Sequence, residues 1–278
     1  MQTPNIQRAG GRCKDLLFNP QERFRIRTAG PGKPSMQTRS PILERFDTPD
    51  AVAMAAAHHL ARLTLSSPAV HVALSGGTTP RRLFRLLASQ PFRDTLRWES
   101  LQLFWGDERN VPPDHADSNF GAARDLLLAT GLIPEANIHR IRGEIDPERE
   151  SQRYGELLKV RLPTDAKGFP RFDLIFLGIG EDGHTASLFP GHEALKEEQA
   201  VCAVTAHPRS GQRRITLTLP AIRAAREIMV LVTGWDKRDV LHRVIRLNGG
   251  EPPVPAARIY PHDGILTWMV DDAAAARL

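Results

Sequence analysis

The sequence contains little cysteine and no long apolar run, and both shortages narrow what the protein can be. Only two of its 278 residues are cysteines, Cys13 and Cys202, far apart in the chain. They give neither a disulfide framework nor the paired spacing of a zinc site, so we expect a protein of the reducing cytoplasm. No apolar segment approaches the roughly 18 residues that a membrane span needs, so no membrane partner is expected.

Several catalytic motifs are also absent. The chain has no H-E-x-x-H segment and no paired C-x-x-C, so we predict no metal site. It has no G-x-S-x-G segment, which counts against a serine hydrolase with a nucleophile elbow. His115 lies between Asp114 and Asp117 in sequence, but a polar loop explains that group at least as well as a metal site.

The positive charge is confined to one end of the chain. The formal net charge is +5, yet residues 1–40 hold eight basic and two acidic side chains, so the remainder carries about −1. We therefore expect residues 1–40 to be a disordered basic extension and residues 41–278 to be the folded domain, with no nucleic-acid partner. Two interpretations of the extension stay open: translation that begins at Met36, or a genuine flexible tail.

The folded part alternates between strand and helix patterns, which predicts an α/β fold with an open, mostly parallel sheet flanked by helices. Helices are expected at 51–65, 81–88, from about 118, and at 236–246. Strands are expected at 42–46, 70–74, 101–105, 172–177, 201–205, 215–219, 228–232 and 266–270. Ligands bind such sheets at the carboxyl ends of the strands. Four unusual segments directly follow strands, at 75–80, 106–109, 178–184 and 234–237, so one shared site is expected.

The segment 75–80 has the composition of an anion-binding turn. Ser75, Gly76, Gly77, Thr78 and Thr79 lead from a strand into a helix. Glycines let the backbone approach a ligand closely, and a helix N-terminus favours an anion. The segment lacks the G-K-[ST] ending of a nucleotide P-loop, so a single phosphate is the expected guest. An ordinary strand-to-helix turn is the alternative.

The segment 178–184 offers a candidate general base. Gly178, Gly180 and Gly183 match the dinucleotide fingerprint G-x-G-x-x-G, but Pro190 interrupts the helix that this fingerprint requires. His184 follows the turn, two residues after Asp182, and histidine is the side chain best suited to proton transfer near neutral pH. A structural histidine is the alternative.

The segment 106–109 places Asp107, Glu108 and Arg109 directly after a strand. The planar guanidinium of Arg109 suits a phosphate, and the carboxylates suit sugar hydroxyls or the orientation of a base. A solvated run of charges explains the same residues if no ligand binds there.

Together these motifs resemble the 6-phosphogluconolactonase family. The matching segments are LSGGTTP at 74–80, WGDERNVP at 105–112, DSN at 117–119, GIGEDGHTASLFP at 178–190, RITL at 214–217 and GWDK at 234–237. The glucosamine-6-phosphate deaminases share the glycine-rich turn and the Asp-Gly-His sequence. In them the chain continues toward Phe-Asn-Glu-Pro, whereas here it continues Thr-Ala-Ser-Leu-Phe-Pro.

The resemblance implies a Rossmann-like sheet with a small secondary lobe and hydrolysis of a sugar-phosphate lactone without a cofactor. It implies that His184 activates water and that Asp182 orients His184. The phosphate is expected on the 75–79 turn with Arg109 and Lys237, and weaker substrate contacts are expected from Asp107, Glu108, Asn119, Gly180 and Arg214. The lactone is the expected partner, and a monomer or small homo-oligomer is expected. A deaminase or isomerase, or a sugar-phosphate sensor without catalysis, are the alternatives.

Overall fold

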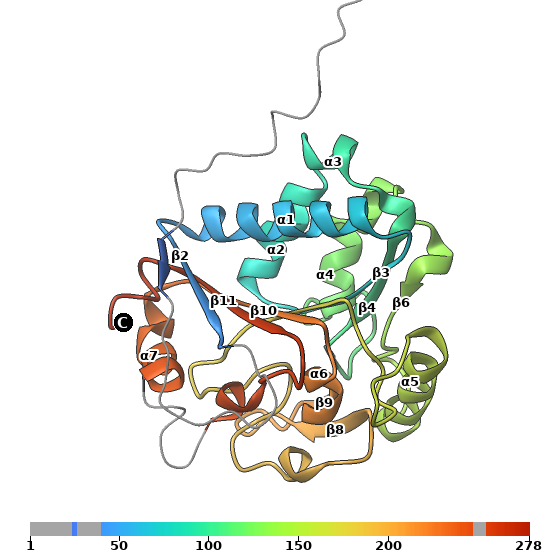
Figure 1. Cartoon of the computed structure of the whole chain (residues 1–278). Coiled ribbons are helices and arrows are strands. Elements are labelled where there is room, and N and C mark those ends of the chain that lie inside the picture. Colours follow the sequence, from blue (N-terminus) through green and yellow to red (C-terminus); the bar gives the residue numbers. More distant parts are fainter. Residues whose placement is uncertain (1–23, 27–39, 247–253) are drawn as a thin grey trace, which may run out of the picture.

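The structure is a computed structural model that describes residues 24–26, 40–246 and 254–278 (Figure 1). The predicted basic extension therefore lies mostly outside the described residues, and Met36, the start in one of the two open interpretations, lies wholly outside them. Residues 24–26 are described as strand β1 (Phe24–Ile26), which pairs antiparallel with β2 (Ile42–Phe46). Whether the rest of the extension is disordered stays a prediction.

The main sheet has eight strands in the order β1-β2-β11-β10-β7-β3-β4-β6. All its neighbours after β1 are parallel. The remaining strands are β3 (Val70–Leu74), β4 (Leu101–Trp105), β6 (Ile138–His139), β7 (Leu174–Leu177), β10 (Glu227–Val232) and β11 (Ile265–Asp271). The predicted α/β fold with a mostly parallel sheet is confirmed.

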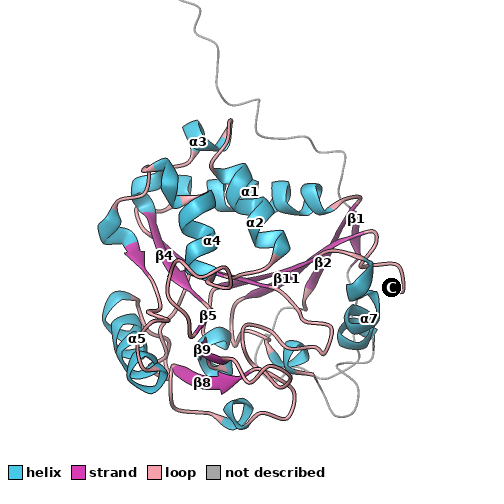
Figure 2. Ribbon diagram, turned by 180° about the vertical axis from the view of Figure 1, so that it is seen from behind, coloured by secondary structure: helices cyan, strands magenta, loops and turns pink. Residues whose placement is uncertain are grey.

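A second sheet of three antiparallel strands lies beside the main one, in the order β5-β9-β8 (Figure 2). Its strands are β5 (Asp107–Arg109), β8 (Cys202–Ala206) and β9 (Arg213–Leu217). Residues 107–109 were expected in a loop after a strand but form β5. Only Gly106 separates them from β4, and the chain there crosses from one sheet to the other. The strands expected at 201–205 and 215–219 form this smaller sheet, displaced by one or two residues.

Helices cover both sheets. Figure 1 shows α1, α2 and α4 on one side of the main sheet, with α5, α6 and the small sheet on the other. The helices are α1 (Pro49–Ser66), α2 (Thr78–Leu87), α3 (Phe92–Thr95), α4 (Asn119–Leu126), α5 (Pro147–Arg161), α6 (Leu219–Arg223) and α7 (Arg238–Arg246). Short 3-10 helices lie at η1 (Trp98–Ser100), η2 (Leu128–Thr130), η3 (Glu135–Asn137), η4 (Glu193–Lys196), η5 (Trp235–Lys237) and η6 (Pro255–Arg258).

The ends of α1 and α5 follow from local chemistry. Thr48 caps α1 by accepting a hydrogen bond from the Ala51 N–H at 3.2 Å, and proline stands in the first turn. Asp146 caps α5 in the same way, with the Arg149 N–H 3.0 Å away. The sequence analysis assigned no helix to 147–161, because its buried face includes Glu150 and Gly155 and so shows no clear apolar period.

Helix α2 begins at Thr78, three residues before the predicted start at 81. Gly77 adopts φ +107°, a conformation that favours glycine, and directs the chain into the helix at once. Thr78 and Thr79 therefore belong to the first helical turn rather than to a loop. Their position brings the N-terminus of α2 to the carboxyl ends of β3 and β10.

Candidate active site

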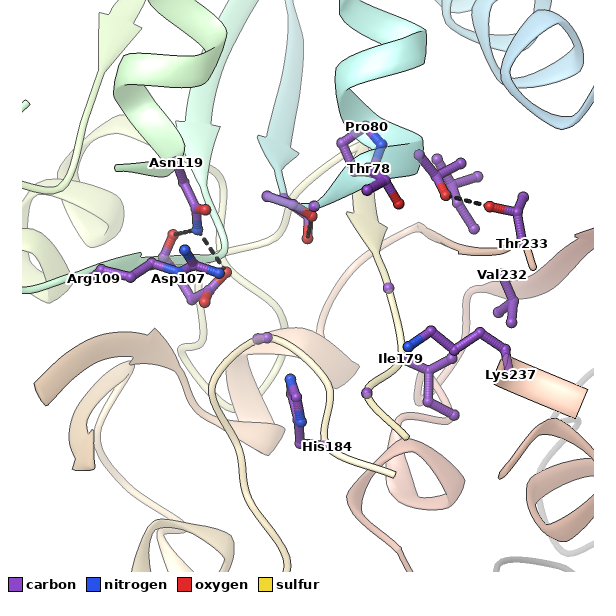
Figure 3. A pocket seen from close by; sticks show the side chains of 18 of the residues that line it. Thr78, Pro80, Asp107, Arg109, Asn119, Ile179, His184, Val232, Thr233 and Lys237 are labelled. Atoms are coloured by element: carbon purple, nitrogen blue, oxygen red, sulfur yellow. Dashed lines mark hydrogen bonds between the residues drawn. The ribbon is translucent and has the colours of Figure 1, made fainter. Parts of the chain in front are cut away.

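A cavity of about 250 Å³ opens at the carboxyl edge of the main sheet (Figure 3). It brings together most of the predicted site residues: Ser75, Gly76, Gly77, Thr78, Thr79, Asp107, Arg109, Asn119, Gly180, His184, Arg214 and Lys237. These residues come from segments more than 160 positions apart in the sequence, between 75 and 237. The four strand ends that were predicted to share a site therefore all line one cavity.

His184 and Asp182 form a close pair. The Nδ1 atom of His184 lies 2.6 Å from Asp182 Oδ1, and the backbone N–H of His184 donates to the same oxygen at 3.1 Å. Burial alone would raise the pKa of Asp182, but the hydrogen bonds from His184 outweigh it and lower the pKa from 3.8 to about 2. An ionised carboxylate only accepts hydrogen bonds, so Nδ1 carries a proton. In neutral imidazole this leaves the Nε2 lone pair free.

Two neighbours fix the ring of His184. The ring of Phe189 has its centroid 4.9 Å from that of His184. A side chain at position 180 would bring its Cβ within 2.1 Å of His184 Nδ1, so only glycine fits there. The Gly180 N–H also donates to the His184 carbonyl at 2.9 Å. Gly180 therefore contributes space and a backbone contact.

The N-terminus of α2 opens on the same cavity. Its N-cap residue, Gly77, offers no side chain to accept from the first N–H groups of the helix. The hydroxyl of Thr79, in the first turn, forms a hydrogen bond of 2.7 Å with the hydroxyl of Thr233, at the end of β10. A Cβ at Gly76 would lie 1.8 Å from the Oδ1 atom of Asn119, so this position requires glycine. A helix N-terminus without a side-chain cap is suited to an anion.

Arg109 and Arg214 lie directly opposite each other in the pairing of β5 with β9. Like charges at directly opposed positions destabilise a sheet. The Nε atoms of both are buried without a hydrogen-bond partner among the described residues. Arg214 is 9% exposed, and burial together with the charge of Arg109 lowers its pKa. An anion bound between the two guanidinium groups would satisfy these donors.

Lys237 supplies positive charge from the other side. Figure 3 shows Lys237 and Arg109 on opposite sides of the cavity, with His184 between them. The Nζ atom of Lys237 lies 3.0 Å from Asp236 Oδ2. Its turn is held by Asp271, whose two carboxylate oxygens each accept from the Gly234 N–H at 3.0 Å. The cavity thus has cationic groups at two separate places.

A family model described as glucosamine-6-phosphate isomerases/6-phosphogluconolactonase matches residues 47–268. The chain belongs to this family. The 6-phosphogluconolactonase of Haemophilus influenzae is 42% identical over 209 residues, which cover 75% of this chain and 88% of the relative.

Solved structures of the family have the same fold. The 6-phosphogluconolactonase of Trypanosoma brucei is 29% identical, with a TM-score of 0.77 over 86% of this chain and 99% of that one. A monomeric glucosamine-6-phosphate deaminase has a TM-score of 0.72 at 20% identity, covering 85% and 99% of the two chains. The fold alone therefore does not separate lactonases from deaminases within the family.

Two predicted site residues do not line the cavity. Glu108 is 1% exposed and accepts hydrogen bonds from the N–H groups of Asn119 and Phe120, at 2.8 and 2.7 Å. Burial raises its pKa against the effect of these donors. Glu108 thus binds the N-terminus of α4, and its predicted contact with substrate stays a prediction. Asp182 also stays outside the lining and reaches the cavity only through His184.

Asp107 lines the cavity from the crossing between the two sheets. Its Oδ2 atom accepts from the Ser187 hydroxyl at 2.7 Å, and its Oδ1 atom lies 3.3 Å from Asn119 Nδ2. The sequence analysis did not name Ala186, Leu231, Val232 or Thr233, which also line the cavity. The strand-end rule points to Thr233, which directly follows β10, but no local signal marks Ala186.

In the described ranges, no three His, Cys, Asp or Glu side chains are grouped so as to hold a metal ion. No helix there is long and apolar enough to cross a membrane.

Proposed function

We propose that the protein hydrolyses 6-phospho-D-glucono-1,5-lactone to 6-phospho-D-gluconate, the lactone-opening step of the oxidative pentose phosphate pathway. The observation that carries the proposal is His184, which pairs with Asp182 and lies between two cationic parts of one cavity (Figure 3). This arrangement suits a phosphorylated substrate that must be attacked by water. Relatives named 6-phosphogluconolactonase, 42% identical in one case, support the same reaction.

The phosphate of the substrate binds at the 75–79 turn and the first turn of α2, which line the cavity and have no side-chain cap. Arg109 and Lys237 provide the countercharge. Arg214, which lies opposite Arg109 in the β5–β9 register, adds a buried positive charge on the Arg109 side of the cavity. Asp107 and Asn119 line the same side and are placed to contact sugar hydroxyls.

His184 acts as the general base. Its Nε2 atom takes a proton from water as the water oxygen attacks the lactone carbonyl carbon, so the carbonyl oxygen becomes an oxyanion. The intermediate then collapses, the bond from this carbon to the ring oxygen breaks, and protonated His184 returns the proton to the ring oxygen. Asp182 stabilises the imidazolium through the 2.6 Å contact. A positioned acid/base group contributes about 10²–10⁴ in rate. The atoms balance with water alone.

A lactone assay tests the proposal. The lactone is generated from glucose 6-phosphate by its dehydrogenase, and its loss is followed with and without the protein, since the lactone also opens unaided. Acceleration by the protein is the expected result. No acceleration by folded protein overturns the proposal. Release of ammonia from glucosamine 6-phosphate would instead identify a deaminase, and phosphate-ester binding without turnover a sensor.

A further inference from the structure

The turn that follows His184 contains a strained residue that the mechanism above does not use. Among the described residues, Ala186 is the only non-glycine residue with positive φ, at +49°. This left-handed conformation is unfavourable for alanine because its Cβ crowds the backbone. Such residues persist only where the surrounding structure holds them, and they concentrate at functional sites. Ala186 also lines the cavity.

Hydrogen bonds on both sides hold the turn in this shape. The Ser187 N–H donates to Thr216 Oγ1 at 3.1 Å, and the Leu188 N–H donates to the Thr185 carbonyl at 2.9 Å. The Ser187 hydroxyl donates to Asp107 Oδ2 at 2.7 Å, and the Thr185 hydroxyl donates to the Gly178 carbonyl at 2.9 Å. Hydrogen bonds to two strands of the small sheet and to the end of β7 therefore hold the strained conformation at position 186.

Two amides of this turn differ from the others. In the described part of the chain the N–H groups of Thr185 and Ala186 have no hydrogen-bond acceptor, whereas those of His184, Ser187 and Leu188 each have one. Thr185 and Ser187 are both 0% exposed, while Ala186 is partly exposed. Of Thr185, Ala186 and Ser187, Ala186 is the residue that lines the cavity.

We infer that the backbone N–H of Ala186 is an oxyanion donor of this site. The inference rests on the proposed lactone hydrolysis. In that reaction the carbonyl oxygen gains a negative charge as water, deprotonated by His184, attacks the adjacent carbon. A donor two residues from the base, held in a fixed direction by the turn, hydrogen-bonds this charge more strongly than it bonds the neutral carbonyl. Fixed donors of this kind act without reorganisation during the reaction.

A single-atom exchange tests the donor. Replacing Ala186 by lactic acid (Ala186→lactate) turns its N–H into an ester oxygen and keeps the methyl side chain. We expect kcat to fall by about 10²–10³, with KM changed little, because the donor acts on the transition state. Ala136→lactate is the matched control. It lies on the exposed turn η3 outside the cavity and should keep the wild-type kcat.

Ala186→Gly distinguishes the effect of the N–H on kcat from the effect of the strained conformation. Glycine keeps the N–H and removes the crowded Cβ, so kcat should stay within about tenfold of wild type. Loss of activity in Ala186→Gly, with activity kept in Ala186→lactate, would show that the strained shape matters and would overturn the inference. Wild-type protein that fails to accelerate the lactone assay would instead overturn the proposed function itself, so the two failures are distinguishable.

An alanine-labelled NMR spectrum of the unmodified chain tests the inference even if the ester variant does not fold. Ala186→Gly identifies the resonance of residue 186 by its absence. Addition of 6-phosphogluconate, which has a carboxylate at the reacting carbon, should move this amide downfield more than any other alanine amide. Glucose 6-phosphate, which has no carboxylate there, should move it little. An Ala186 amide that responds to neither compound, or equally to both, contradicts the inference.

Discussion

The main sheet satisfies its charged side chains more completely at the amino edge than at the carboxyl edge. At the amino edge, His71 Nδ1 lies 2.9 Å from Asp173 Oδ2, and Arg226 Nε lies 3.2 Å from the other oxygen of the same carboxylate. His59 Nε2 there lies 2.6 Å from Glu227 Oε2. Each of these groups has a partner of opposite charge or a hydrogen-bond acceptor within the fold.

At the carboxyl edge, Arg109 and Arg214 face each other, and their Nε atoms have no hydrogen-bond partner among the described residues. Ala186 there holds a strained conformation. These features lower the stability of the unliganded protein, and a bound anion relieves the first of them. The same sheet is thus stabilised by ion pairs at the amino edge and is suited to bind a ligand at the carboxyl edge. Strain and unpaired donors at functional sites are held by the stability of the rest of the fold.

The largest effect on kcat is expected from removing His184 at the carboxyl edge, and removing His71 at the amino edge is its control. His184→Ala should lower kcat of lactone hydrolysis about 10²–10⁴-fold, because it removes the general base. His71→Ala should leave kcat unchanged and lower the melting temperature, because Asp173 loses a partner. Steady-state kinetics and thermal unfolding of both variants check this. Equal loss of kcat in the two variants would contradict the contrast between the edges.

A matched pair of arginines gives the next effect. Arg109→Ala should raise KM roughly 10–100-fold with a smaller change in kcat, since a hydrogen bond to a charged group contributes about 1.5–3 kcal/mol. Its melting temperature should not fall, because the repulsion from Arg214 is removed. Arg226→Ala should do the reverse, with normal KM and lower stability. Kinetics that show a large kcat loss for Arg109→Ala would place this residue at the reacting carbon instead.

Asp182→Asn should have a moderate effect. We expect kcat to fall roughly 10-fold, because a neutral amide supports the imidazolium less than a carboxylate does. The folded pKa of Asp182, about 2, is below its ordinary value of 3.8. The carboxylate therefore adds stability above pH ~4 that is lost as pH falls toward ~2. Thermal unfolding between these pH values should show wild type and variant converging, and a constant difference would oppose this.

The smallest effect concerns His139, which does not line the cavity. Burial, with the charges of Arg161 and His71, lowers its pKa from 6.5 to about 4. Neutral His139 thus adds stability above pH ~6.5 that is lost as pH falls through ~4, about 1 kcal/mol by pH 5.5. His139→Gln should remove this dependence and leave kcat unchanged. Urea unfolding at pH 7 and 5.5 measures it, and identical pH dependence in both proteins would exclude His139 as the source.

Local sequence was enough to predict much of the site. The strands at 42–46, 70–74 and 101–105 were predicted at their observed bounds. The last two are short, mostly apolar runs followed by turn residues, which leave little choice. His184 and the glycine turn at 75–79 were predicted from residue chemistry at strand ends. Helix α5 was missed because its buried positions include a charged residue and a glycine, so its apolar pattern is weak.

The sequence by itself determined which residues meet, since parallel strands bring their carboxyl ends to one edge. It determined the His184–Asp182 pair too, since two residues across a glycine turn lie close. Only the tertiary structure decided that Arg109 opposes Arg214, that Glu108 faces α4 rather than the cavity, and that Ala186 is strained. The physical reason is that strand register, burial and backbone strain depend on contacts between segments far apart in the chain. No local pattern contains that information.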